Sequence, residues 1–268
     1  MNDIKFEKYG FGKRLKSMLA VDFRRMFTMR LFYIMFGTCL VIPILILVMT
    51  TLMDGSVSVN PQTGEETVIE GFDNTWQIIG TISGESNAMS MDMTAMCNIN
   101  LLYFFVAVLV CIFVAEDFRS GYAKNLFTVR AKKGDYIISK TLVCLVGGIS
   151  MILGFFIGSM LGGAISGLPF DTGVAGTSGV IMCLLSKMLL IAVFVPIYLL
   201  ASVAAKQKLW LSLVISFAIG MIFFMMIPML TPLNAGIMNV MLCLAGGVIF
   251  SIIFGAISNQ VLRKTSLV

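Results

Sequence analysis

Long apolar runs separated by short polar segments make up most of the chain. Six of these runs are long enough to cross about 30 Å of hydrocarbon as a helix, which takes about 20 residues. Five contain no charged residue, and the fourth contains only Lys187. The pattern predicts an all-α integral membrane protein with six transmembrane helices, at about Leu31–Met53, Met96–Ala115, Thr141–Ile165, Val180–Ala205, Leu209–Leu230 and Gly236–Ser258.

The positive charges alternate with the apolar runs. Eighteen of the 19 Lys and Arg residues lie in the N-terminal segment, between the second and third runs, between the fourth and fifth, and after the sixth. The intervening loops contain none. Because cytoplasmic loops retain Lys and Arg, this asymmetry predicts a multi-pass protein of the plasma membrane with both termini in the cytoplasm.

The composition excludes several other classes. Hydrophobic residues make up 58% of the chain and charged residues 12%, with a mean hydropathy of +0.96, which a water-soluble domain does not reach. The net charge is +5, and the cations lie between the apolar runs, where they set the orientation in the membrane. Their expected partner is therefore the lipid bilayer, and no nucleic acid is expected. There is no histidine and no CxxC spacing, which argues against a zinc site and a disulfide scaffold.

Residues 1–30 form the first predicted unit, a cytoplasmic tail with an amphipathic elbow helix, ahead of the membrane domain 31–268. Apolar residues recur there at helical spacing, with cations opposite, as in helices that lie in the headgroup layer. Asp22 falls on the apolar side and therefore needs a partner. The helix is either a simple anchor or an elbow that carries motion into the first span.

The loop 116–140 between the second and third spans is the most informative segment. Acids open it at Glu116 and Asp117, and cations follow it, which suits both ends of a helix dipole. A plain connector has no need for four large apolar residues. The pattern therefore favours a docking helix whose apolar ridge faces a groove on a partner protein; the ridge comprises Phe118, Tyr122, Leu126 and Phe127.

The same loop carries a family resemblance. It has the form Glu-x4-Gly-x2-Lys-x-Leu at Glu116, Gly121, Lys124 and Leu126, and a basic–tyrosine–lysine series follows at Arg130, Tyr136 and Lys140. With the amphipathic N-terminal helix and six spans, the whole chain resembles the ABC-2 class of ATP-binding-cassette membrane subunits. Pro228 and Pro232 are similar to the family's broken outer end of the fifth span.

The resemblance implies that the loop is a coupling helix seated in an ATPase subunit. It implies these coupling residues: Glu116, Asp117, Phe118, Arg119, Gly121, Tyr122, Lys124, Asn125, Leu126, Phe127 and Arg130. The chain has no GxxxxGK[ST] phosphate loop, so two copies of a separate ATPase would bind ATP and Mg, and this chain would have no catalytic residue or cofactor. A second permease copy, identical or similar, is expected.

The outer loop 54–95 is long for a connector and predicts a small hairpin across Asn60–Glu66. The stretch Asn74–Ala95 is either an external gate or lid or a segment without a specific role. Five soft sulfur ligands follow near its end, at Met89, Met91, Met93, Met96 and Cys97, a set that suits Cu(I). Methionine is abundant throughout, however, with 21 residues, and a flexible lining for apolar cargo explains the same residues without a metal.

Three residues are predicted to face a cargo: Lys187, Met225 and Met226. Lys187 either extends outward to the interface or faces a cargo path. The expected function is export of an amphipathic peptide or a hydrophobic compound, as in similarly sized peptide-toxin, antimicrobial-peptide or drug exporters. A secondary transporter is the main alternative, although no span contains Asp or Glu. A non-transporting sensor or assembly protein is the other.

Small residues recur every fourth position in two spans. Ser150, Gly154, Gly158 and Gly162 form one such row in the third span, and Gly247, Ser251 and Gly255 form another in the sixth. Such rows let helices approach closely in lipid, where there is no hydrophobic drive for association. They predict close packing within the chain in preference to a subunit interface.

Overall fold

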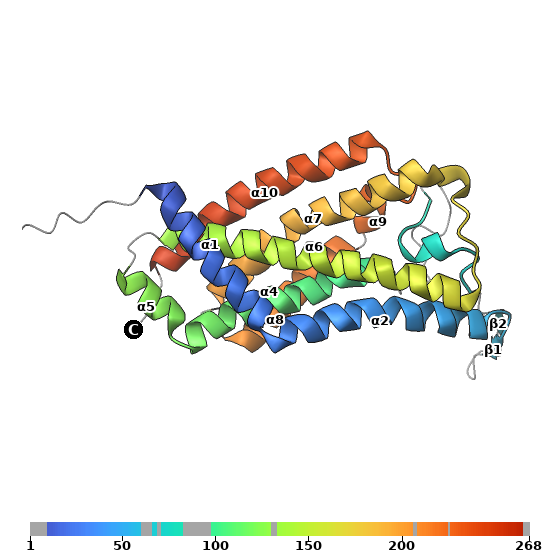
Figure 1. The fold of residues 1–268 in the computed structure, drawn as a ribbon, viewed down its shortest axis with the longest axis horizontal. Coiled ribbons are helices and arrows are strands. Elements are labelled where there is room, and N and C mark those ends of the chain that lie inside the picture. Colours follow the sequence, from blue (N-terminus) through green and yellow to red (C-terminus); the bar gives the residue numbers. More distant parts are fainter. Residues whose placement is uncertain are drawn as a thin grey trace, which may run out of the picture.

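The computed structural model describes residues 10–59, 66–68, 71–82, 98–129, 133–205, 208–224 and 226–264. Within these ranges the chain is a bundle of helices running along one axis (Figure 1). The helices are α1 (Phe11–Thr28), α2 (Arg30–Met53), α4 (Leu102–Arg119), α5 (Tyr122–Val129), α6 (Lys133–Ser166), α7 (Gly176–Ala204), α8 (Leu209–Phe224), α9 (Ile227–Leu230) and α10 (Ile237–Lys264).

Five helical segments are long and apolar enough to cross a membrane: α2, Ile99–Arg119, α6, α7 and α10. They coincide with five predicted spans, although α6 begins eight residues earlier than expected and α10 ends six residues later. The predicted fifth span is divided into α8, of 16 residues, and α9, of four, with Pro228 in the first turn of α9. The all-helical membrane architecture is confirmed, and the sixth crossing stays a prediction.

The two ends of the bundle differ. At one end α1 lies obliquely across the spans near α5 (Figure 1). The described part of the chain begins at this end and α10 ends there, and we call it the α5 end. At the other, the hairpin end, β1 (Val57–Val59) pairs antiparallel with β2 (Glu66–Val68), as the turn-rich sequence between them predicts. Short 3₁₀ turns cover the same end: η1 (Thr75–Ile78), η3 (Ile99–Leu101) and η4 (Gly173–Ala175).

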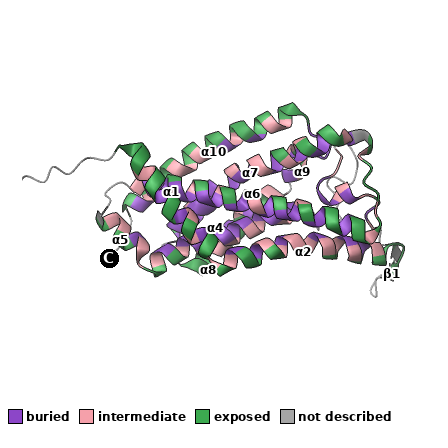
Figure 2. Cartoon of the chain, viewed as in Figure 1, coloured by how far each residue is buried: buried purple, intermediate pink, exposed green. Residues whose placement is uncertain are grey.

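Burial is concentrated in the centre of the bundle. Most of α4 and α7 is buried, whereas α10 and one face of α2 expose apolar side chains along their length (Figure 2). Lipid accepts such a surface at no cost, so the helices must be held together by shape and by polar contacts.

Glycines allow the closest helix contact, between α2 and α6. A Cβ atom added at Gly158 would lie 2.1 Å from the carbonyl oxygen of Leu40, and one at Gly162 would lie 2.9 Å from the Cα of Ile44. The row of small residues in α6 thus packs against α2 of the same chain, as predicted. In α10, Gly247 packs against Ala192, but nothing lies within 4 Å of a Cβ at Gly255.

We expect Gly158→Ala to separate α2 from α6, because backbone atoms cannot move aside as a flexible side chain does. Overpacking of this kind costs about 1–3 kcal/mol or more of unfolding free energy. Denaturant unfolding of the purified protein in micelles would measure the loss. Gly255→Ala is the matched control and should leave stability unchanged or slightly higher. Equal stability of the two variants would show that the α2–α6 approach is not tight.

Candidate functional site

The α5 end joins four helices through a short turn and a set of buried charges. Ser120 and Gly121 connect α4 to α5, and Gly121 has a φ of +74°, a left-handed conformation that glycine adopts without steric cost. The chain therefore changes direction between α4 and α5 within two residues of Arg119. The start of α6 packs against α1, and the end of α4 and the start of α5 reach α1 through Asp117 and Tyr122, which both contact Arg25.

Four charged side chains and a tyrosine form what we call the charge cluster: Asp22, Arg25, Asp117, Tyr136 and Lys140. The Lys140 ammonium lies 2.8 Å from Asp22 Oδ1 and 2.6 Å from Asp117 Oδ2. Arg25 donates to the other oxygen of Asp117, and the Tyr136 hydroxyl donates to Asp117 over 2.9 Å. Asp22 also accepts a hydrogen bond from Ser139.

The cluster is balanced in charge and closed to water at its centre. Two carboxylates face two cations, and Asp22, Asp117 and Lys140 are fully buried. Lys140 also lies 3.8 Å from the centre of the Phe113 ring. Burying a charge costs several kcal/mol unless a partner compensates, so each member requires the others. The cluster therefore locks α1, α4 and α6 into one relative position.

Aromatic residues connect α5 to this cluster. The Arg25 guanidinium lies 4.0 Å from the centre of the Tyr122 ring, and the rings of Phe127 and Tyr136 meet edge to face at 5.3 Å. Burial raises the pKa of Tyr122, and so do Asp22 and Asp117, while Arg25 lowers it. Tyr122 therefore remains a neutral phenol at physiological pH.

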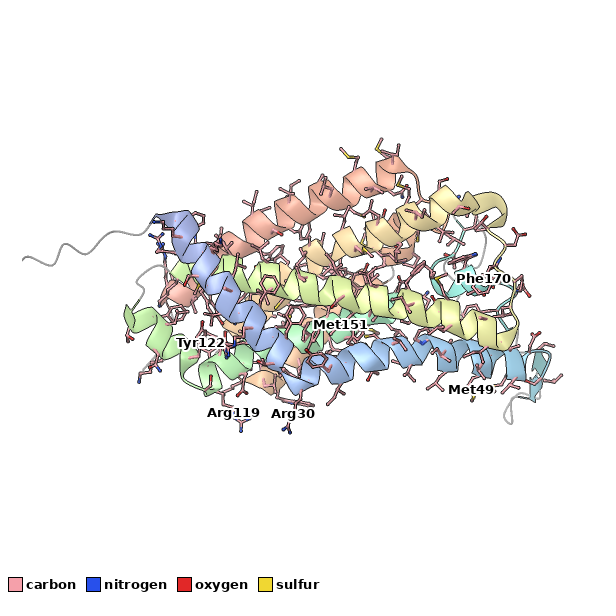
Figure 3. All side chains as sticks on the ribbon, in the orientation of Figure 1. Arg30, Met49, Arg119, Tyr122, Met151 and Phe170 are labelled. Atoms are coloured by element: carbon pink, nitrogen blue, oxygen red, sulfur yellow. The ribbon has the colours of Figure 1, made fainter. Side chains whose placement is uncertain are left out.

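The predicted apolar ridge, with Phe118 at the end of α4 and the other three residues in α5, is part-exposed and packs largely against the chain itself. Tyr122 and Phe127 pack on α1 and α6, and Phe118 and Leu126 contact the same hydrophobic core. The physical reason is that Tyr136 and Arg25 supply ring partners within the chain. The exposed face of the segment is polar instead, and it comprises Glu116, Arg119, Lys124 and Asn125. Figure 3 shows Tyr122 among the helices and Arg119 pointing away from them.

Two further contacts fasten the rim of this end. Arg14, near the start of α1, forms an ion pair with Asp135 at 3.0 Å. Lys133 donates to the carbonyl oxygen of Leu262 over 2.9 Å, which joins the start of α6 to the end of α10. The spacing of residues along the sequence did not predict any of these pairings. Asp22 alone carried a signal, as an acid on an apolar helix face.

Lys187 occupies a second buried polar site, about three turns into α7. It is fully buried, so it does not extend to the interface. Its ammonium donates to Asn100 Oδ1 at 2.8 Å, in η3, and to Thr231 Oγ1 at 2.9 Å, just after α9. Tyr103 donates to the carbonyl oxygen of Lys187 itself. Whether a cargo reaches it stays a prediction.

An apolar cavity of about 190 Å³ lies next to this site. Met226 is on its wall, together with residues of α7, α8, α9 and α10 that include Leu190, Phe194, Ile227, Cys243 and Phe250. Met225, Arg130 and the sulfur-rich group Met89, Met91, Met93, Met96 and Cys97 lie outside the described residues. In the part of the chain that is described, no three His, Cys, Asp or Glu residues are grouped as metal ligands would be.

Residues 28–225, about three quarters of the chain, match the family model described as ABC-2 family transporter protein. The chain belongs to the ABC-2 transporter family. No curated protein and no solved structure matches it. Membership makes it the permease of an ABC transporter, a multi-pass membrane subunit of a generally non-catalytic kind that associates with an ABC ATPase subunit. The matched region contains α5 and Lys187, whereas Asp22 and Arg25 precede it.

We expect the ABC-2 permease to lose about 3–5 kcal/mol of unfolding free energy when Lys140→Met removes the cation that contacts buried Asp22 and leaves Asp117 with Arg25 alone. Denaturant unfolding in micelles would measure this. Lys124→Met removes an exposed lysine of the same end and should change stability by less than about 0.5 kcal/mol. If both variants unfold at the same denaturant concentration, the charge cluster does not hold the helices together.

Proposed function

We propose that this chain is the permease subunit of an ABC exporter that moves an amphipathic peptide or a hydrophobic compound out of the cell. A separate ATPase, present in two copies, binds ATP and Mg and supplies the energy. The permease works as a homodimer or beside a similar permease. ABC-2 family membership supports the class, and the geometry of the α5 end supports the route by which the energy enters.

The single observation that carries the proposal is the attachment of α5. This short helix exposes a polar face and presses its aromatic side against α1 and α6. A partner that docks on Glu116–Arg130 and moves α5 also moves the elbow helix through Tyr122 and Arg25. It moves the start of α6 through Phe127 and Tyr136. The transported substrate then responds to the difference between two packings of the spans.

The orientation follows from the charges. Arg119, Lys124, Arg263 and Lys264 are exposed at the α5 end. We place this end in the cytoplasm, where the ATPase is, and the hairpin end outside. In this arrangement α8 and α9 together make the fifth of six crossings, and α1 lies in the headgroup layer with its exposed cations toward anionic lipid.

The cargo class is supported by the cavity beside Lys187. Its walls are aliphatic, aromatic and sulfur-containing, which suits an apolar group of variable shape. We propose that Met225, Met226 and Lys187 face the cargo path. A secondary transporter is less favoured, because among the described residues the buried carboxylates Asp22, Asp117 and Asp135 gather at the α5 end, away from the middle of the spans.

The coupling role predicts that a bulky residue on the exposed face of α5 blocks ATPase docking. We expect Asn125→Trp to lower permease-dependent ATPase activity of the purified complex about tenfold, the equivalent of 1.4 kcal/mol, while the spans remain folded. Gln260→Trp, exposed on α10 at the same end, is the matched control and should retain activity. Full activity of Asn125→Trp would contradict the assignment of α5.

The orientation is tested by accessibility in intact cells. In a background without the native cysteines, Ser56→Cys at the hairpin end should react with a membrane-impermeant maleimide. Lys124→Cys in α5 should react only after the membrane is permeabilised. Both positions are exposed in the structure, so a difference in reaction reports the side of the membrane. The reverse pattern would place α5 outside the cell and remove the proposed energy source.

A further inference from the structure

Lys187 is a buried amine with no carboxylate partner among the described residues. Its nitrogen donates to Asn100 and Thr231, and both acceptors are neutral. Thr231 in turn donates to the carbonyl oxygen of Ile227, so its hydroxyl must accept from Lys187. Among the ion pairs formed by the described residues, none includes Lys187. The contrast is with Lys140, equally buried but held by two carboxylates.

The nitrogen has one open position. Besides its bond to carbon it has three tetrahedral positions, and Asn100 and Thr231 occupy two. If the nitrogen is charged, the open position holds an N–H without an acceptor. If it is neutral, the position holds a lone pair, which takes up the proton that a carboxylic acid releases on binding. Either state is completed by a carboxylate, which supplies both the acceptor and the missing negative charge.

The apolar cavity lies on the same side of α7. Leu190 and Phe194 line it and follow Lys187 by three and seven residues, so all three share one helix face. Another wall residue is tied to the lysine's surroundings: the Ile227 carbonyl oxygen accepts from Thr231, which accepts from Lys187. Lys187 does not line the cavity itself, but it lies one turn before Leu190 on the same face, so a molecule whose tail fills the cavity can reach the lysine with its head.

We propose that Lys187 and this cavity form a binding site for a carboxylate attached to an apolar chain, either an alkyl carboxylic acid or the free C-terminus of an apolar peptide. Lys187 pairs with the carboxylate, Asn100 and Thr231 orient the ammonium, and the cavity takes the adjoining apolar segment. At about 190 Å³ the cavity is smaller than the roughly 300–1,000 Å³ of sites for whole drug-sized ligands, so it receives one end of a longer molecule. The site deepens the proposed export function by naming the chemistry of the cargo.

The test uses photoaffinity labelling of the complete permease–ATPase complex in zwitterionic nanodiscs without ATP. The probes are dodecanoic acid with a diazirine in its tail and the matching dodecanamide. Mass spectrometry locates the labelled residues. We expect the acid to label cavity residues of α8 and α10, at least tenfold more than the amide does, because a hydrogen bond to a charged group is worth more than a neutral one.

Two variants separate binding from folding. Lys187→Met should reduce cavity labelling by the acid about tenfold, to the level of the amide. Asn100→Asp keeps the lysine and its packing but places a carboxylate 2.8 Å from the ammonium. Asn100→Asp should fold at least as stably as the wild type, and it should reduce labelling by the acid as much as Lys187→Met does. Equal labelling by acid and amide, or undiminished acid labelling of Asn100→Asp, would overturn the site.

The source of the carboxylate is resolved by competition. A decapeptide of leucine and alanine with a free C-terminus and its C-terminally amidated form are compared with unlabelled dodecanoate. Unlabelled dodecanoate should compete with its own probe. Additional competition by the free peptide and not by its amidated form identifies a peptide cargo, whereas no effect of either peptide identifies an acyl cargo. Because no ATP is present, this result is independent of coupling: Lys187-dependent binding in a complex that fails to export would refute only the proposed function.

Discussion

The arrangement of the ABC-2 permease depends on the placement of one ammonium group between two carboxylates. Lys140, on α6, contacts Asp22 of the elbow helix and Asp117 at the end of α4 at the same time. In a bilayer, apolar contact between helices is hardly more favourable than apolar contact with lipid. A buried ion pair does favour helix association, because separating its members leaves charges that neither lipid nor protein compensates. Three helices therefore share one allowed position at this end.

This constraint connects the mobile part of the proposed mechanism to the rigid part. The α5 helix is bound to the charge cluster by ring contacts through Tyr122 and Phe127, not by ion pairs of its own. Further along, α6 and α2 meet so closely at Gly158 and Gly162 that side chains cannot intervene. A displacement that starts at α5 is therefore transmitted along α6 into α2 with little slack, because backbone atoms of α2 face Gly158 and Gly162 directly.

Sequence periodicity predicted the features that depend on a whole segment. These features each involve many residues: the long apolar runs, the alternating cations, the hairpin and the row of small residues on α6. The structure shows five span-length apolar helices, the hairpin and the packed row, whereas the cytoplasmic side of the cations stays a prediction. The pairing of Asp22 with Lys140 was hidden, because the two are 118 positions apart and nothing local links them. The side chains of the ridge predicted to face a partner contact the chain itself and are part-exposed. Apolar periodicity shows which residues share a face, not whether that face meets the chain itself or a partner.

The division of the fifth apolar run has a consequence for the membrane around the protein. With 16 residues, α8 is about 24 Å long, less than the roughly 30 Å of a typical hydrocarbon core. On other sides of the bundle, the exposed helices α2 and α10 have 24 and 28 residues and exceed that thickness. The protein thus presents a short hydrophobic edge on one side and long edges elsewhere. The resulting mismatch favours thinned bilayer beside α8, with the exposed Trp210 anchored at the interface, so host-membrane thickness influences how stably this side is seated.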